Sequence, residues 1–302
     1  MKFLTLENGQ LGAVIDTDHG TTVVELTLAS QLLGVPLECS TMAELVAADE
    51  ATCLQIWALA QQSVGETTAC RSFRDVKPLA PLPQPRRNII CLGKNYREHA
   101  EEMAKKLGDG DAIPRHPIFF TKATTSVIGT DEPIPAHRHI TTKLDYEAEL
   151  AIIIGKGGRD ISREQAMQHV FGYTAFNDVS ARDLQSDHLQ WYRGKSLDGF
   201  APMGPVVVHR LVMPPPEAIE IRCWVNCEQR QLATLADLIF DIPGIIETLS
   251  AGATLLPGDI IATGTPAGVG MGFSPARYLQ AGDEVAVEIT GAGRLVNHVA
   301  YD

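Results

Sequence analysis

The chain has no cysteine cluster of the kind that builds a zinc knuckle or a disulfide framework. Its six cysteines are scattered over 302 residues, and none forms a Cys-x-x-Cys pair. Neither a cysteine-based metal site nor an oxidised scaffold is therefore expected. Cys223 alternates with apolar residues in "IEIRCWVN" (219–226), a pattern that predicts a small core residue rather than a nucleophile.

Long apolar runs and an excess of basic residues are also missing. No apolar stretch approaches the roughly 18 residues that cross a membrane, and the first residues, MKFLTLENGQ, lack the continuous apolar core of a secretion signal. Asp and Glu number 37 against 25 Lys and Arg, which gives a net charge of −12. Neither nucleic acid nor an anionic membrane is therefore an expected partner. We expect a cytoplasmic protein that attracts an anionic substrate through local positive charge or a metal.

A proline-rich segment divides the chain. "KPLAPLPQPRRN" (77–88) has four prolines within eight residues, which favours an extended connector over a helix or strand. We predict a small N-terminal α+β domain at 1–76, a Pro-rich linker at 77–87 and a catalytic domain at 88–302. No repeat, heptad pattern or low-complexity tract appears.

The predicted elements are mostly short strands. In the N-terminal part we expect strands at 2–6, 12–16 and 22–26, then helices from Thr41, where Thr41-Met-Ala-Glu44 fits a capping box. Beyond the linker, helices are predicted at 96–107, 162–170 and 235–250. Strands are predicted at 88–92, 117–120, 145–155, 172–178, 205–208, 219–226, 259–263 and 284–289. This composition predicts a β-rich α+β fold and not a Rossmann fold or a β/α barrel.

Three acids alternate directly before an aliphatic run in "LDYEAELAIIIG" (144–155). In a strand, residues two apart share a face, so Asp145, Glu147 and Glu149 would form a row with roughly 6.6 Å between neighbours. One cation could then draw two of them together. The alternative is a solvated outer face of an antiparallel strand, where such alternation is ordinary.

Two further segments carry candidate functional groups. In "FGYTAFNDVSARDLQ" (171–185), Asp178 falls near a strand end, with Arg182 and Gln185 just beyond it; functional groups collect at such ends, although a capping aspartate is an alternative. In "GKNYREHAEEM" (93–103), His99 and Glu102 are three apart on a helix. The carboxylate could orient the imidazole to activate water, but a plain exposed surface pair has the same spacing.

Two other patterns do not predict sites. His137 and His139 have no third histidine or cysteine near them in the sequence, so a loop is the simpler interpretation. "TGTPAGVGMG" (263–272) lacks the Lys-Ser/Thr ending of a phosphate-binding loop. Its glycines indicate a tight backbone path.

Taken in order, five motifs resemble the fumarylacetoacetate hydrolase family over roughly residues 88–301. They are "LGKNYREHAEE", "LDYEAEL", "GYTAFNDVSARDLQ", "WYRGKSLDGFAPMGP" and "LLPGDIIATGTPAGVG". The resemblance implies a mixed β-roll or sandwich fold, usually a homodimer. It also implies that residues 1–76 correspond to the small N-terminal domain of bacterial members.

The resemblance also implies roles for single residues. Glu147, Glu149 and Asp178 match the carboxylates that hold Mg²⁺ or Mn²⁺ in the family, and His99 with Glu102 matches its water-activating dyad. Arg182, Gln185 and Lys195 match residues that position the water and stabilise the developing enolate. Tyr96, Lys122 and Thr265 match residues that contact the substrate. Tyr96, His99 and Glu102 fall on a lid segment, and 104–116 is predicted to be its mobile part.

The ligand chemistry agrees with this assignment. Three carboxylates without an imidazole form a hard, all-oxygen site that favours Mg²⁺ or Mn²⁺ over Zn²⁺. Its open positions suit a chelating 2-oxo acid and a water. We predict a C–C bond hydrolase acting on an acylpyruvate or related 1,3-diketo acid. The alternatives are a decarboxylase of oxaloacetate-type β-keto acids and a dehydratase or lyase of sugar-derived 2-keto acids.

Overall fold

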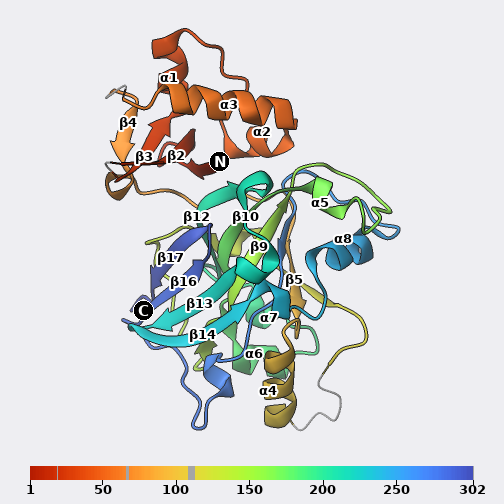
Figure 1. Ribbon diagram of the computed structural model, residues 1–302. Coiled ribbons are helices and arrows are strands. Elements are labelled where there is room, and N and C mark those ends of the chain that lie inside the picture. Colours follow the sequence, from red (N-terminus) through yellow and green to blue (C-terminus); the bar gives the residue numbers. More distant parts are fainter. Residues whose placement is uncertain (19, 66–67, 108–112, 302) are drawn as a thin grey trace.

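The computed structural model describes residues 1–18, 20–65, 68–107 and 113–301. Within them a mixed sheet forms the centre of the molecule (Figure 1). Its strands run in the order β4 (Cys70–Ser72), β3 (Gly20–Glu25), β2 (Leu11–Thr17), β1 (Lys2–Thr5), β12 (Ala201–His209), β10 (Val170–Asn177), β9 (Ala148–Ile154), β15 (Ile260–Ala262), β5 (Ile89–Gly93) and β6 (Ile118–Lys122), while β7 (Val127–Ile128) pairs with β12 off this path.

Two smaller sheets complete the β structure of the described residues. One has the order β14 (Glu228–Thr234), β13 (Glu220–Val225), β16 (Glu284–Ile289) and β17 (Gly293–His298), and the other pairs β8 (Leu144–Asp145) with β11 (Ser180–Ala181). The helices are α1 (Leu26–Leu33), α2 (Met42–Ala47), α3 (Glu50–Gln62), α4 (Arg97–Leu107), α5 (Ala166–His169), α6 (Arg182–Asp187), α7 (Tyr192–Lys195) and α8 (Ile242–Ser250).

The large sheet is buried on both faces, because alternate residues of its central strands enter two different cores. In β9, Ile152 packs with Ile221 and Val287 of the four-stranded sheet, whereas Ile153 belongs to the core that contains Leu45 and Leu59 of helices α2 and α3. This two-sided burial explains the continuous aliphatic run of β9. The predicted β-rich α+β sandwich is confirmed.

The N-terminal strands extend the same sheet. Strand β1 pairs with β12 through Phe3 and Val207, and the proline-rich segment runs beside β1, where the Leu79 amide donates to the Thr5 carbonyl at 2.9 Å. Figure 1 shows α1–α3 together at one end of the molecule and α4 at the other. The three-part division at 1–76, 77–87 and 88–302 stays a prediction.

Most predicted strands are present with ends shifted by a few residues, and the exceptions have local causes. Residues 26–33 form α1, which the sequence does not predict. The helix predicted at 235–250 begins only at Ile242, where Asp241 caps it and Pro243 occupies its first turn. The strand predicted at 145–155 is broken between Asp145 and Ala148. The capping box of Thr41 and Glu44 is confirmed, as is the burial of Cys223.

Candidate metal and active site

Three buried carboxylates meet where β9 begins and β10 ends. Glu147 precedes β9, Glu149 lies within it, and Asp178 directly follows β10. The strands are antiparallel, and the Asp178 amide donates to the Glu147 carbonyl at 2.8 Å. One oxygen from each carboxylate lies within 4.8 Å of the others. Among the described residues this is the one group of three or more potential metal-ligating side chains.

The alternating acids are not a solvated strand face, so that interpretation is wrong. Glu147 is 6% exposed, and Asp145 and Glu149 are fully buried. The three acids do not share one strand either, because β8 ends at Asp145 and pairs there with Ser180 of β11. The Asp145 carboxylate accepts a hydrogen bond from Nε of Arg182 at 2.8 Å. Asp145 therefore belongs to the interior beside the metal-ligand candidates.

Buried cations contact these carboxylates. Lys195 Nζ lies 2.8 Å from Glu147 Oε2 and 2.7 Å from Asp178 Oδ2. Lys122 Nζ lies 2.5 Å from Asp178 Oδ1. Arg182 Nη1 lies 2.6 Å from Glu147 Oε1. The ammonium and guanidinium groups thus hold two of the three carboxylates in fixed orientations.

With every group ionised, the charge balance of this cluster would change sign on binding of a divalent cation. Four buried carboxylates, those of Asp145, Glu147, Glu149 and Asp178, are opposed by three buried cations, those of Lys122, Arg182 and Lys195. With Mg²⁺ or Mn²⁺ in place the cluster would carry a net positive charge. An anionic substrate would then be attracted to the site.

Glu149 is the carboxylate with the least compensation. Burial, followed by the charges of Asp178 and Glu147, raises the pKa of Glu149 well above its ordinary value. Its Oε1 is buried and has no hydrogen-bond partner among the described residues. Burial alone would also raise the pKa of Glu147, but Lys195 and Arg182 hold it below its ordinary range. An orphaned oxygen in an all-carboxylate set fits a hard divalent cation.

Mg²⁺ affinity should therefore rise with pH. A metal ligand must be ionised, and the raised pKa of Glu149 means that binding displaces a proton from the protonated fraction. Titration calorimetry over a pH series, in buffers with different ionisation enthalpies, should detect a proton release that shrinks as pH approaches and passes that pKa. A pH-independent affinity without proton release would contradict this electrostatic description.

His99 and Glu102 form a pair on α4 in which the imidazole is buried and the carboxylate is partly exposed. Nδ1 of His99 lies 3.3 Å from Oε2 of Glu102, and His99 is only 6% exposed, so the interpretation as an exposed surface pair is wrong. The Gly268 amide approaches both Glu102 oxygens, at 3.3 and 3.4 Å. Gly272 packs so closely on Glu102 that a side chain there would collide with the carboxylate. These contacts fix Glu102, which can then orient the imidazole.

A cavity of about 720 Å³ is lined by both His99 and Glu147, whereas Glu149 and Asp178 of the carboxylate cluster do not line it. The predicted site residues among those that line it are His99, Glu147, Arg182, Gln185, Lys195 and Thr265. Glu102 does not line it and supports His99 instead. Tyr96 and Lys122 do not line it either, although substrate contacts are predicted for both: the Tyr96 hydroxyl is buried, and Lys122 binds Asp178. Residues 108–112 of the predicted mobile lid lie outside the described residues.

One wall of this cavity is aromatic, which the sequence does not reveal. Phe120 and Trp191 pack edge to face, with ring centroids 5.3 Å apart and an interplanar angle of 68°. The Trp191 ring lies so close to Gly93 that a Cβ at this position would collide with it. Lys94 lines the same cavity with a φ of 53°. Such left-handed backbone is uncommon outside glycine and concentrates at functional sites.

Gln231 is a supporting residue that sequence reasoning misses. Its Nε2 donates to Thr265 Oγ1 at 2.8 Å, and its Oε1 accepts from the Ala148 amide at 3.0 Å. It thereby ties Thr265, which lines the cavity, to the start of β9. Gln231 lies on β14, a strand that the sequence pattern does not predict, so only the pairing of β14 with β13 brings it here.

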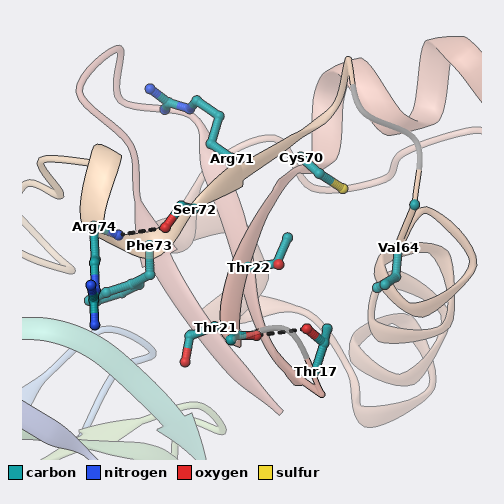
Figure 2. Close-up of a pocket in the computed structure, with 11 residues that line it drawn as sticks. Thr17, Thr21, Thr22, Val64, Cys70, Arg71, Ser72, Phe73 and Arg74 are labelled. Carbon is teal, nitrogen blue, oxygen red and sulfur yellow. Dashed lines mark hydrogen bonds between the residues drawn. The ribbon is translucent and has the colours of Figure 1, made fainter.

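A larger cavity of about 820 Å³ lies in the N-terminal part, beside β3 and β4. Figure 2 shows its two arginines, Arg71 and Arg74, pointing away from each other. The Arg71 guanidinium is already balanced by Glu7 at 3.0 Å and Glu25 at 2.8 Å. The described residues that line this cavity therefore offer no convergent set of charges, in contrast to the smaller cavity.

Comparison with known proteins identifies the family. The family model of the C-terminal domain of fumarylacetoacetate (FAA) hydrolase matches residues 88–300. The chain belongs to this family. Oxaloacetate tautomerase YisK from Bacillus subtilis (strain 168) is 51% identical over 228 residues, which are 76% of this chain and 74% of that protein. The chain is thus an enzyme of the fumarylacetoacetate hydrolase family, as the motifs predict.

Solved structures of family members show the same fold. Fumarylacetoacetate hydrolase from the psychrophile Exiguobacterium antarcticum is 38% identical, with a TM-score of 0.79 over the whole of both chains. Maleylpyruvate hydrolase from Sphingobium sp. SYK-6, solved with manganese(II) and pyruvate, is 30% identical, with a TM-score of 0.73 over 99% of each chain. No helix in the described part of this chain is long and apolar enough to cross a membrane. The homodimer stays a prediction.

Proposed function

We propose that the protein is a divalent-metal-dependent enzyme that interconverts the keto and enol forms of oxaloacetate. The observation that carries this proposal is the placement of His99 and Glu147, one of the three clustered carboxylates, on one cavity that the ammonium group of Lys195 also lines. The 51% identity to an oxaloacetate tautomerase supports the choice of substrate. This substrate replaces the acylpyruvate of the sequence-based prediction as the first candidate.

The proposed reaction moves one proton between carbon and oxygen. Glu147, Glu149 and Asp178 would hold Mg²⁺ or Mn²⁺, which supplies a Lewis acid for the 2-oxo group. His99, oriented by Glu102, takes a proton from C3 of the substrate, and the protonated imidazole then gives a proton to the C2 oxygen, which completes the enol and regenerates neutral His99. The ammonium group of Lys195 stabilises the negative charge that develops on that oxygen between the two transfers.

Hydrolysis of an acylpyruvate is the second candidate, and the size of the cavity favours it. Cavities of about 300–1,000 Å³ typically enclose drug-sized ligands, so 720 Å³ exceeds what a four-carbon diacid fills. The wall of Phe120 and Trp191 could pack against an apolar acyl group. His99 would then deprotonate a water that attacks the distal carbonyl. The C–C bond would break, and the pyruvate enolate would regain a proton at carbon.

A small substrate panel tests the two candidates. With Mg²⁺ we expect the purified protein to accelerate the decay of enol absorbance after oxaloacetate is added as the enol, with no loss of total oxaloacetate. Acetylpyruvate and an aroylpyruvate should be cleaved more slowly or not at all. Release of pyruvate from acylpyruvates as the faster reaction would favour the second candidate, and release of CO₂ from oxaloacetate would favour a decarboxylase.

A further inference from the structure

Asp145 is a fully buried acid for which neither the metal site nor the cavity has a direct use. It is not one of the three clustered carboxylates, and it does not line the 720 Å³ cavity. Its carboxylate nevertheless makes four hydrogen bonds. Oδ1 accepts from the amides of Gly270 at 2.7 Å and Tyr146 at 3.0 Å, and Oδ2 accepts from Arg182 Nε at 2.8 Å and the Met271 amide at 3.0 Å.

The backbone around residue 270 is built to receive this carboxylate. A Cβ on Gly270 would lie 2.5 Å from Asp145 Oδ1, so the amide can approach only because residue 270 has no side chain. Two successive amides, those of Gly270 and Met271, point at the two oxygens of one carboxylate. Such an arrangement binds an anion strongly and sets the position of the loop.

Two of the groups that bind Asp145, the Arg182 guanidinium and the 268–272 loop, also contact residues of the candidate active site. Arg182, held at Nε by Asp145, uses Nη1 to contact Glu147 Oε1 at 2.6 Å and Gln185 Oε1 at 3.1 Å. The loop held through Gly270 and Met271 also supplies the Gly268 amide that binds Glu102. The Asp145 carboxylate thus connects Arg182, which contacts Glu147, with the loop whose Gly268 amide binds Glu102.

We infer that Asp145 is a positioning residue that holds the Arg182 guanidinium and the 268–272 loop in register, and so sets Glu147 and Glu102 relative to each other across the cavity. It contacts neither substrate nor metal. This inference rests on the proposed function for its activity assay, while its binding and stability measurements do not depend on the reaction.

The test compares Asp145→Asn with a matched control, Asp259→Asn. Asp259 is 6% exposed, and its carboxylate accepts from Arg87 Nε at 2.9 Å and the Leu256 amide at 2.7 Å. It lies before β15, at the end opposite to Thr265, so the same substitution alters a buried aspartate paired with an arginine away from the site, although Arg87 is more exposed than Arg182. Both variants should lower the thermal midpoint. Only Asp145→Asn should also lower kcat, by roughly 10–100-fold, the cost that misplaced supporting groups typically impose.

Measurements of metal and inhibitor binding distinguish a positioning residue from a metal ligand and from a residue that only stabilises the fold. In Asp145→Asn the midpoint increase caused by Mg²⁺ should persist, because Lys195 still holds Glu147, while the affinity for oxalate in the presence of Mg²⁺ should fall. Loss of the Mg²⁺ response, or a kcat within twofold of that of Asp259→Asn, would overturn the inference. Oxaloacetate turnover by the wild-type protein tests the proposed function separately.

Two further variants make the inference testable even if Asp145→Asn does not fold. Asp145→Glu keeps the charge but displaces it by one methylene, so kcat should fall with little change in the thermal midpoint. Arg182→Lys removes the fork that links Asp145 to Glu147. Because Asp145 acts partly through Arg182 and partly through the loop, the double variant Asp145→Glu/Arg182→Lys should lose less kcat than the product of the two single losses. Additive losses in kcat, or an unchanged kcat in Asp145→Glu, would contradict positioning through Arg182.

Discussion

Glu149→Gln should abolish the stabilisation by Mg²⁺ without destabilising the metal-free protein. At about one hundred times its dissociation constant, a ligand of the native state adds about 2.7 kcal/mol to the free energy of unfolding, which corresponds to roughly 4 °C for a chain of 302 residues. Glutamine cannot supply an anionic ligand, so this increase should vanish. It can still accept the hydrogen bond from the Gly264 amide, which lies 2.8 Å from Glu149 Oε2.

The metal-free midpoint of this variant should equal or exceed that of the wild type. The pKa of Glu149 is raised in the folded state, so ionising this group costs stability as pH rises from its unfolded value of about 4.3 towards the folded value. The metal-free midpoint of Glu149→Gln should therefore exceed that of the wild type by an amount that increases over this pH range. Differential scanning calorimetry with EDTA or Mg²⁺ measures both effects, and a full Mg²⁺ response in the variant would contradict the metal assignment.

Asp178→Ala provides the contrasting control. Asp178 pairs with both Lys122 and Lys195, so its removal leaves the buried ammonium group of Lys122 without its carboxylate and that of Lys195 with Glu147 alone. Breaking a buried ion pair in this way costs about 3–5 kcal/mol. We therefore expect Asp178→Ala to lose the metal response and metal-free stability together, whereas Glu149→Gln loses only the former.

His99→Ala should lower kcat/KM for oxaloacetate tautomerisation by about 10²–10⁴-fold, the usual contribution of a positioned general base. Mg²⁺ and oxalate binding should change little, because the imidazole is not among the clustered carboxylates. Steady-state kinetics at saturating Mg²⁺, with calorimetric oxalate binding, measure both quantities. Glu102→Gln should show a smaller loss in kcat, since glutamine can still contact Nδ1 of His99 but cannot stabilise its protonated form.

Two other results for His99→Ala would each indicate a different mechanism. Decarboxylation of oxaloacetate needs no such base, so CO₂ release that survives the substitution would show that the metal site alone performs that reaction. Tautomerisation within a few-fold of the wild-type rate would show that the pair of His99 and Glu102 stabilises α4 and does not take part in catalysis. Asp259→Asn is again a suitable control, because it perturbs a buried carboxylate away from the cavity.

The sequence predicts the site residues better than their arrangement. Glu147, Glu149 and Asp178 are recognisable because ordered motifs place them in a family, and β9 and β10 then bring them within 4.8 Å. The simple alternation argument places Asp145 with them, but the break between β8 and β9 turns it to Arg182 and the 270–271 amides. Strand periodicity cannot reveal a break that depends on pairing with a distant segment, here β11.

Other features depend on contacts that only folding creates. Gln231 reaches Thr265 from a strand without a clear pattern, and Trp191 rests on Gly93, about a hundred residues away in the chain. The burial of His99 contradicts the charged appearance of its helix, because Ala100, Met103 and Ala104 provide the apolar face that packs inwards. The glycines of "TGTPAGVGMG" (263–272) indicate a tight backbone path, but they do not reveal that amides of this segment bind Glu102 and Asp145.

The most direct measurement of the central claim is the rate at which the metal-stripped protein converts enol oxaloacetate to the keto form before and after Mg²⁺ is restored. The proposal predicts a rate near the uncatalysed one in EDTA, restoration by Mg²⁺ or Mn²⁺ in the wild type, and no restoration in Glu149→Gln. Full activity in EDTA, or restoration in Glu149→Gln equal to that of the wild type, would contradict a metal-dependent enolising site at these carboxylates.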